Sequence, residues 1–312
     1  MTTASAVPIT RDDELEGDEA LETLRAVGRR RLLVDTVDRF RAADAFSHSR
    51  ALAFQFTLTL LPALIALVGL AAALDQEDVT RTVRATIEAL APGAAGEILT
   101  DALRQGTTAA RRENGETALV GGGLAALIAG TTAMAQIERG SNRLYGVERD
   151  RPFLRKYGRA LVLTLSAGVL ALLSVVLLVG GSALRDAAGW SDGFDTAWSI
   201  ARWPLGLAFA VTAVAVLFEW APRRRQPEPS WLAFGAAAST VLWLAFMAVF
   251  ALYVEATGSF GATYGPIAGT IGVLLWAFLS AVALFAGVAL AAQLEAVRVG
   301  VASPRVDREE ND

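Results

Sequence analysis

Long apolar stretches alternate with shorter charged stretches along the chain after residue 50. Six of these stretches hold about 20 residues or more, and a helix of that length crosses roughly 30 Å of hydrocarbon. They cover residues 51–74, 117–137, 160–184, 201–221, 231–254 and 264–290. None alternates polar and apolar residues as a membrane β-strand does. The pattern therefore predicts an all-α fold, a polytopic membrane helical bundle with six transmembrane helices.

The segments before and after the six-span domain, residues 51–298, have a different character. Residues 1–28 are acidic and residues 299–312 are polar, so both are predicted to be disordered, the latter as a cytoplasmic tail. Residues 29–50 are predicted to form an amphipathic helix at the membrane interface. Its basic residues and its apolar residues at helical spacing are Arg29, Arg30, Arg31, Leu33, Val37 and Phe40.

The basic residues are sorted between the two sides of the predicted membrane. The termini and the even-numbered loops hold 21 of the 28 Lys and Arg residues, which places both termini in the cytoplasm. The long extracytoplasmic loop, residues 77–112, has apolar positions at helical spacing on both sides of Pro92-Gly93. It is predicted to form an amphipathic helical hairpin, which either packs on the spans or closes as a lid over a cavity.

Composition narrows the chemistry. The chain is 54% hydrophobic and 19% charged, whereas a soluble domain carries about 25% charged residues. There is no Cys and one His, His48, which excludes disulfides, thiolate metal sites and His-His pairs. We therefore expect no metal, no cofactor and no catalytic residues. The first span begins only at residue 51, behind a charged leader, which argues against a cleaved signal peptide.

Few polar or helix-breaking residues fall inside the spans or at their ends, and these are the candidates for a substrate path or its gates. Broken helices often line such paths, although a Pro in a span is more often a simple bend. The candidates are Gln55, Pro62, Gln136, Arg139, Asn142, Glu219, Tyr264, Gly265 and Pro266. No Asp, Glu, Lys or His lies near the middle of a span, which disfavours coupling through a mid-membrane carboxylate. A Glu at a helix end, such as Glu219, is either part of such a path or simply an interfacial group that is solvated or paired with Arg.

Small residues recur every fourth position in two places, and such faces let two helix backbones come close. They are Gly122, Ala126 and Gly130 in the second span, and Gly261, Gly265 and Gly269 near the last. The faces serve either packing within the chain or a homo-oligomer.

Several short motifs, in this order, resemble the YihY/virulence factor BrkB family of bacterial inner-membrane proteins. They include Ser49-Arg50-Ala51-Leu52-Ala53-Phe54, Leu61-Pro62, Leu144-Tyr145-Gly146-Val147, Arg151-Pro152-Phe153, Trp231-Leu232-Ala233-Phe234-Gly235-Ala236, Tyr264-Gly265-Pro266-Ile267-Ala268-Gly269 and Leu284-Phe285-Ala286-Gly287. The resemblance implies six helices, a cell-membrane location and no established reaction, since the family's former ribonuclease BN label is a misassignment. The family's Gly-Ala-Glu-Leu-Asn is replaced here by residues 287–291 without the Glu. Any proton transfer through that Glu is thus absent or moved to Glu295.

The leading hypothesis is a non-enzymatic membrane protein that acts as a transporter or a flippase-like handler of lipid or another amphipathic substrate. It rests on the broken first and last spans, the external hairpin and the lack of mid-membrane charge. Its partners are membrane lipids, and no nucleic acid is expected. The alternative is a scaffold or interaction protein of the cell envelope. A membrane-embedded hydrolase or ribonuclease comes third, because no side chains converge as catalysis requires.

Overall fold

The computed structural model describes residues 2–10, 15, 17–73, 100–101, 103–104, 108, 115–178, 192–257, 268–301 and 303–307. The helices of these residues are α1 (Gly17–Val27), α2 (Arg29–Ala42), α3 (Ala45–Ala73), α6 (Gly115–Leu144), α7 (Phe153–Leu178), α9 (Asp192–Trp220), α10 (Pro229–Thr257) and α12 (Ala268–Arg298). Strands β1 (Thr2–Ala4) and β2 (Arg305–Asp307) pair antiparallel.

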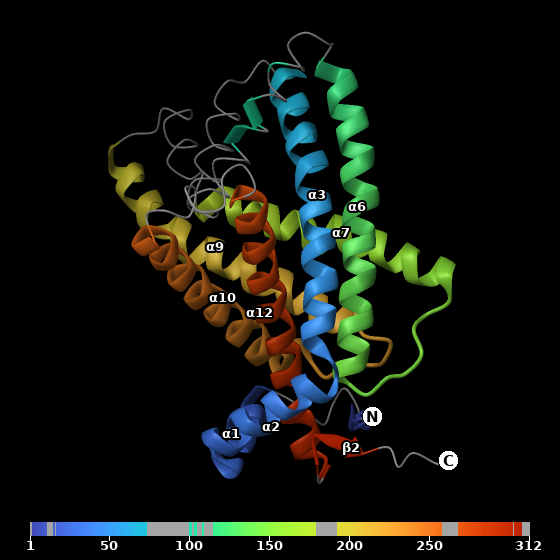
Figure 1. Cartoon of the computed structure of the whole chain (residues 1–312). Coiled ribbons are helices and arrows are strands. Elements are labelled where there is room, and N and C mark those ends of the chain that lie inside the picture. Colours follow the sequence, from blue (N-terminus) through green and yellow to red (C-terminus); the bar gives the residue numbers. More distant parts are fainter. Residues whose placement is uncertain are drawn as a thin grey trace.

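Six of these helices are long and apolar enough to cross a membrane, which confirms the predicted all-α bundle. They are α3, α6, α7, α9, α10 and α12. The apolar window of α12 is 44% buried, against 17–28% for the other five, so α12 is the central helix. In Figure 1, α12 runs between α10 on one side and the upright pair α3 and α6 on the other. The chain is therefore a multi-pass membrane protein with its remaining helix surfaces open to lipid.

Glycine allows the closest helix contacts. A Cβ on Gly287 of α12 would lie 2.5 Å from the carbonyl oxygen of Gly235 of α10, so these two backbones touch. On α6, a Cβ on Gly122 would lie 2.7 Å from the backbone nitrogen of Ala66 in α3. The predicted small-residue face of the second span thus packs within the chain at Gly122. Gly261 and Gly265 lie outside the described residues.

The prediction of disorder at the two ends is wrong for the described residues. Residues 2–4 and 305–307 form the two-stranded sheet, and residues 17–27 form α1. Leu15 and Ala20 are fully buried, and Arg298 at the end of α12 pairs with Glu19 at 2.7 Å. Acidic composition suggested disorder, but a few apolar residues dock this segment on the bundle.

The predicted interfacial helix, residues 29–50, is two elements. Helix α2 ends at Ala42, and Asp44 adopts a positive φ of 50° that turns the chain before α3 begins at Ala45. His48 is consequently part of the first spanning helix. The exposed side chains of Arg29 and Leu33 agree with an interfacial face on α2. The predicted external hairpin lies almost entirely outside the described residues.

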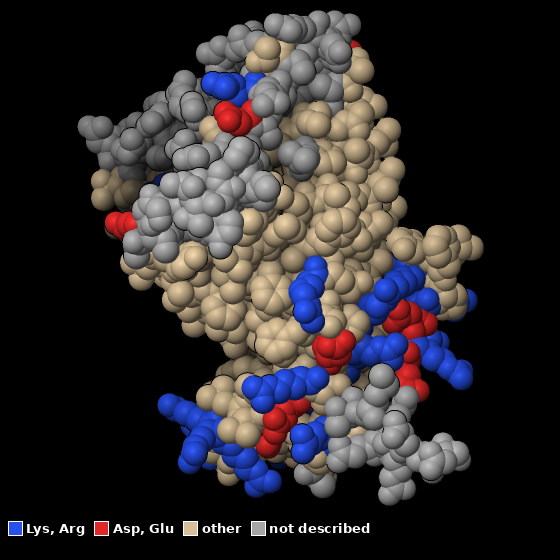
Figure 2. All heavy atoms as spheres, viewed as in Figure 1, with Lys and Arg blue, Asp and Glu red and all other residues tan. Residues whose placement is uncertain are grey.

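Both chain ends lie at the same end of the bundle (Figure 1). We call this end the base; it comprises α1, α2, the β1–β2 sheet, the α6–α7 loop (145–152) and the α9–α10 loop (221–228). Charged side chains gather on the base in Figure 2, whereas the flank above it is almost free of them. By the distribution of basic residues, the base is the end predicted to face the cytoplasm.

Candidate functional site at the base

Two of the predicted gating residues join α3 to α6 inside the membrane region. Gln55 accepts a hydrogen bond from the hydroxyl of Thr132 at 2.9 Å. Gln136 Nε2 donates to Nδ1 of His48 at 3.3 Å, which accepts in the tautomer protonated at Nε2. Both glutamines thus bridge two helices. Pro62 lies within α3, which continues to Ala73, and Tyr264, Gly265 and Pro266 lie outside the described residues.

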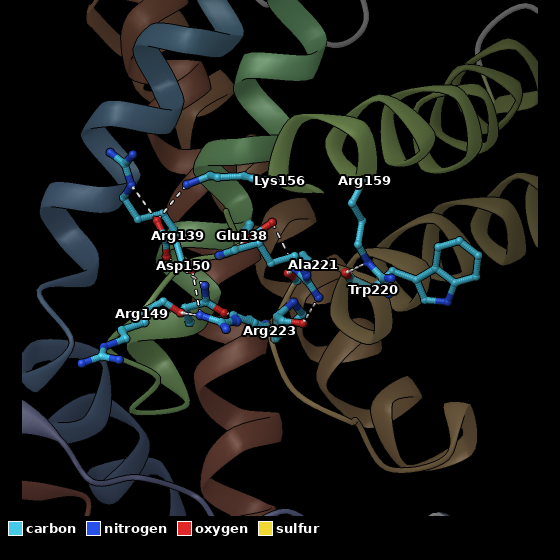
Figure 3. Close-up of polar contacts among 12 residues, drawn as sticks. Glu138, Arg139, Arg149, Asp150, Lys156, Arg159, Trp220, Ala221 and Arg223 are labelled. Atoms are coloured by element: carbon cyan, nitrogen blue, oxygen red, sulfur yellow. Dashed lines mark hydrogen bonds and ion pairs between the residues drawn. The ribbon is translucent and has the colours of Figure 1, made fainter. Parts of the chain in front are cut away.

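Arg139 lies in a polar cluster around Asp150 (Figure 3), and Asn142 also bonds this carboxylate. Asp150 accepts hydrogen bonds from Asn142 Nδ2 at 2.9 Å and Lys156 Nζ at 2.8 Å, and Arg139 Nε lies 3.4 Å away. Burial raises the pKa of Asp150, but the hydrogen bonds from Lys156 and Asn142 outweigh it and hold the pKa below its ordinary value of 3.8. Asp150 is therefore an anion at neutral pH and holds the α6–α7 loop on the two helices it connects.

A second ion pair ties this loop to the end of α9. Glu138 is buried and lies 3.1 Å from Arg151 Nη1. The same guanidinium donates to the carbonyl oxygens of Ala221 and Pro222, each at 2.7 Å. The backbone N–H of Arg223 donates to the Asn142 side chain at 2.7 Å. The α6–α7 and α9–α10 loops are consequently bonded into one connected layer, which we call the loop layer.

Glu219 lies at a pocket of about 400 Å³ where α9 leaves the predicted membrane region. Arg159 of α7 donates to the carbonyl oxygen of Trp220 at 2.8 Å, and its guanidinium lies 5.3 Å from the Trp220 ring centroid. We call this the boundary pocket. Its lining consists of Arg159, Glu219, Trp220, Arg224, Arg225, Gln226, Pro227, Glu228 and Pro229.

Sequence reasoning missed the buried charges of Arg39 and Arg224, and it considered Glu295 only as a substitute proton carrier. Arg39 and Glu295 are each 0% exposed, and the side chain of Arg224 is 2% exposed. Both terminal nitrogens of Arg224 donate hydrogen bonds to the Glu295 carboxylate, at 2.5 and 3.1 Å. The helical spacing of apolar residues could have indicated that Arg39 is buried, since Leu32, Arg39 and Phe40 share one buried face of α2.

Burial lowers the pKa of Arg39 from 12.5 to about 10, so Arg39 still carries its charge at neutral pH. Glu295 forms an ion pair with Arg224, and its negative charge also acts on Arg39 from a greater distance. Because Thr10 and Arg224 already bond this carboxylate, it has little capacity to carry protons. Among the described residues, no group of three or more His, Asp or Glu side chains is placed to hold a metal ion.

Asp150→Asn is expected to lower the free energy of unfolding by about 1 kcal/mol at neutral pH, because the amide loses the charge-assisted bond from Lys156 at a partly exposed site. In the wild type, ionised Asp150 contributes fully to the free energy of unfolding above about pH 3.8, the ordinary pKa of Asp. This contribution is lost as the pH falls through the lower pKa of folded Asp150. Thermal unfolding in lipid discs measures both effects. Asp35→Asn, at the exposed Arg31 pair, is the control. A deficit that persists unchanged in acid would contradict the assignment.

Comparisons with known proteins agree with this architecture. The family model described as virulence factor BrkB matches residues 36–311. A ribonuclease-like protein, YfkH, of Bacillus subtilis (strain 168) is 29% identical over 259 residues, covering 82% of this chain and 92% of the relative. No solved structure matches. The family match and the six apolar helices place the protein in the bacterial inner membrane. The chain belongs to the virulence factor BrkB family of multi-pass membrane proteins, as its motifs indicate.

Proposed function

We propose that this protein is a non-enzymatic carrier of an amphipathic molecule with an anionic headgroup, acting as a transporter or flippase-like protein on lipids of the cytoplasmic leaflet. The observation that carries the proposal is the boundary pocket. It lies where span α9 ends, and its lining holds three arginines, Arg159, Arg224 and Arg225, against two carboxylates, Glu219 and Glu228. Guanidinium groups bind phosphate and carboxylate by paired hydrogen bonds, so an anionic headgroup suits this pocket.

The two spanning helices whose ends contribute to the pocket, α7 and α9, expose apolar side chains that suit an acyl chain. Leu161 and Leu165 on α7 and Leu207 on α9 are exposed apolar side chains of spanning helices. Arg159 is held against Trp220 at the end of α9, at the depth where tryptophans meet lipid headgroups. A molecule with its headgroup in the pocket can therefore keep its tail in the hydrocarbon.

Three carboxylates of the base, Glu138, Asp150 and Glu295, favour a carrier over an enzyme. A general acid or base must be free to exchange a proton with its substrate. Glu138, Asp150 and Glu295 each lie in an ion pair with at least one other hydrogen-bond donor. These carboxylates are therefore better suited to hold the loops than to transfer protons.

The test is lipid movement across liposomes containing the purified protein. Fluorescently labelled phosphatidylglycerol in the outer leaflet is bleached by a membrane-impermeant reductant, and the rate at which protected lipid becomes accessible is recorded. We expect movement above that of protein-free liposomes, and Arg159→Gln to slow it about ten-fold, the value of one charge-assisted hydrogen bond.

Arg155→Gln is the matched control, since Arg155 is exposed one turn earlier on α7 and does not line the pocket. It should leave the rate unchanged. Equal rates for wild-type, Arg159→Gln and protein-free liposomes would refute the proposal. Equal movement of labelled phosphatidylcholine would refute its headgroup preference.

A further inference from the structure

The N-terminal residues 2–10 cross the base as an extended segment, which we call the strap. Strand β1 pairs with β2, and the backbone N–H of Val7 donates to the carbonyl oxygen of Tyr145 at 3.1 Å. Gly146 has a φ of +71°, and a Cβ there would lie 2.5 Å from Cα of Ala6. The strap therefore passes directly over the end of α6, at a position where any side chain would block it.

The strap supplies backbone oxygens to both buried guanidinium groups. Arg39 Nη1 donates to the carbonyl oxygen of Ser5 at 2.9 Å, and Arg224 Nη2 donates to that of Pro8 at 3.0 Å. Among the described residues no carboxylate lies within ion-pair distance of Arg39, whose other acceptors are the neutral oxygens of Leu144 and Gln293. A buried cation with only neutral acceptors is the setting in which an anion binds best.

Several buried polar atoms next to these guanidinium groups have no hydrogen bond of good geometry. They are Arg39 Nη2, Arg224 Nε, Tyr145 Oη and both side-chain amide atoms of Gln226, of which the side chains of Tyr145 and Gln226 lie next to each other. Such atoms are rare in folded proteins, and a group of them calls for a ligand or water. The Arg224 guanidinium lies 4.6 Å from the Tyr145 ring centroid. Burial raises the pKa of Tyr145, so its hydroxyl keeps its proton and is a hydrogen-bond donor.

This set of buried donors borders the boundary pocket. Arg224 and Gln226 both line the boundary pocket, although the Gln226 residue is only 8% exposed. The set holds two cations and one carboxylate, Glu295, and so carries a net positive charge. A phosphate group matches it, because its oxygens accept hydrogen bonds from guanidinium, hydroxyl and amide donors together.

We propose that Arg39, Tyr145, Arg224 and Gln226 form a binding site for a phosphate group, and that the strap covers this site with the carbonyl oxygens of Ser5 and Pro8. The phosphate belongs either to a soluble ion or to a lipid headgroup, which share this chemistry. Removal of the strap frees one terminal nitrogen of each guanidinium for the ligand. A two-stranded β ribbon is marginally stable on its own, so the strap is able to leave.

The chain has no Cys, so a disulfide is a clean lock for the strap. Ala4 and Arg305 face each other across β1 and β2, and Arg305 is exposed. In the double variant Ala4→Cys, Arg305→Cys, the reduced protein in phosphatidylcholine discs is expected to bind inorganic phosphate by calorimetry. The oxidised protein is expected to bind it about ten-fold more weakly or worse, since charge-assisted bonds are lost. The two single-Cys variants should show no dependence on oxidation.

A second arm distinguishes the sources of the phosphate. Discs containing phosphatidic acid, without soluble phosphate, are compared with phosphatidylcholine discs by hydrogen exchange of the Ser5 and Val7 amides. Faster exchange in phosphatidic acid alone identifies a lipid headgroup. Faster exchange on adding inorganic phosphate identifies a soluble ion. Both results support the site.

Arg39→Gln should abolish the response to either ligand, whereas Arg298→Gln, in the exposed pair with Glu19, should retain it. The lock experiment needs neither variant, so misfolding of Arg39→Gln leaves the test intact. Binding that is equal in the locked and unlocked states, or absent in both arms, overturns the proposal. Because no lipid movement is measured here, failure of transport would not affect the outcome.

Discussion

Glu295→Gln is expected to lower the free energy of unfolding by about 3–5 kcal/mol, among the largest effects of any single substitution in the chain. The side chain is fully buried and accepts both terminal nitrogens of Arg224 and the hydroxyl of Thr10. The neutral amide would leave Arg39 and Arg224 as two buried cations without an anion. Equilibrium unfolding in mixed detergent micelles measures the loss.

Glu19→Gln is the matched control, because Glu19 also pairs with an arginine of the base, Arg298, but at an exposed site. It should cost less than about 1 kcal/mol. Combining Arg224→Gln with Glu295→Gln should cost less than the two single changes together, since the pair is removed as a unit. A Glu295→Gln protein as stable as Glu19→Gln would show that the buried pair is not what holds α12 to the α9–α10 loop.

The six spans were predictable because a membrane helix needs only a long apolar stretch, which is a local property of the sequence. Their ends were harder to place. The first span helix starts at Ala45, before the apolar run, because the turn that separates it from α2 is at Asp44 and leaves no mark in hydropathy. The last span helix continues to Arg298, carrying Glu295 with it.

The site was predicted only in part, for a different reason. Asn142 and Arg139 were chosen as polar residues at a helix end, and the structure places both beside Asp150. Arg39 was counted only as one of the basic residues on the predicted cytoplasmic side. Its neighbour Gln293 is 254 positions away in the chain, so no local pattern pairs them. Burial of a charge depends on which elements meet, and that is decided by the fold.

The strap shows the same limit. It belongs to the acidic N-terminal segment, residues 1–28, whose composition is typical of disorder, although residues 2–10 themselves carry no charged side chain. Its stability comes from partners distant in sequence, Pro304 for Ser5 and Tyr145 for Val7. Because the strap also contacts Arg39 and Arg224, it links the two chain ends, α2 and the α9–α10 loop in one layer. Because α12 runs from the base through the centre of the bundle, a displacement of this layer would also displace the end of α12.

Gly287→Ala is expected to destabilise the protein by about 2–3 kcal/mol, although alanine favours a helix over glycine by about 1 kcal/mol. The new Cβ would lie 2.5 Å from the carbonyl oxygen of Gly235 and 2.6 Å from Cβ of Ser239. Backbone atoms cannot rotate away, so α10 and α12 must separate along their contact. Unfolding in mixed micelles measures the change in stability.

Gly168→Ala on α7 provides the opposite case, because a Cβ there meets nothing within 4 Å. The same substitution should be neutral or stabilising by up to about 1 kcal/mol, since only the helix preference of alanine remains. The difference in sign separates close backbone packing from a general effect of removing glycine from a membrane helix. If both variants are equally stable, α10 and α12 are able to part at little cost, and the tight contact at Gly287 does not hold the centre of the bundle together.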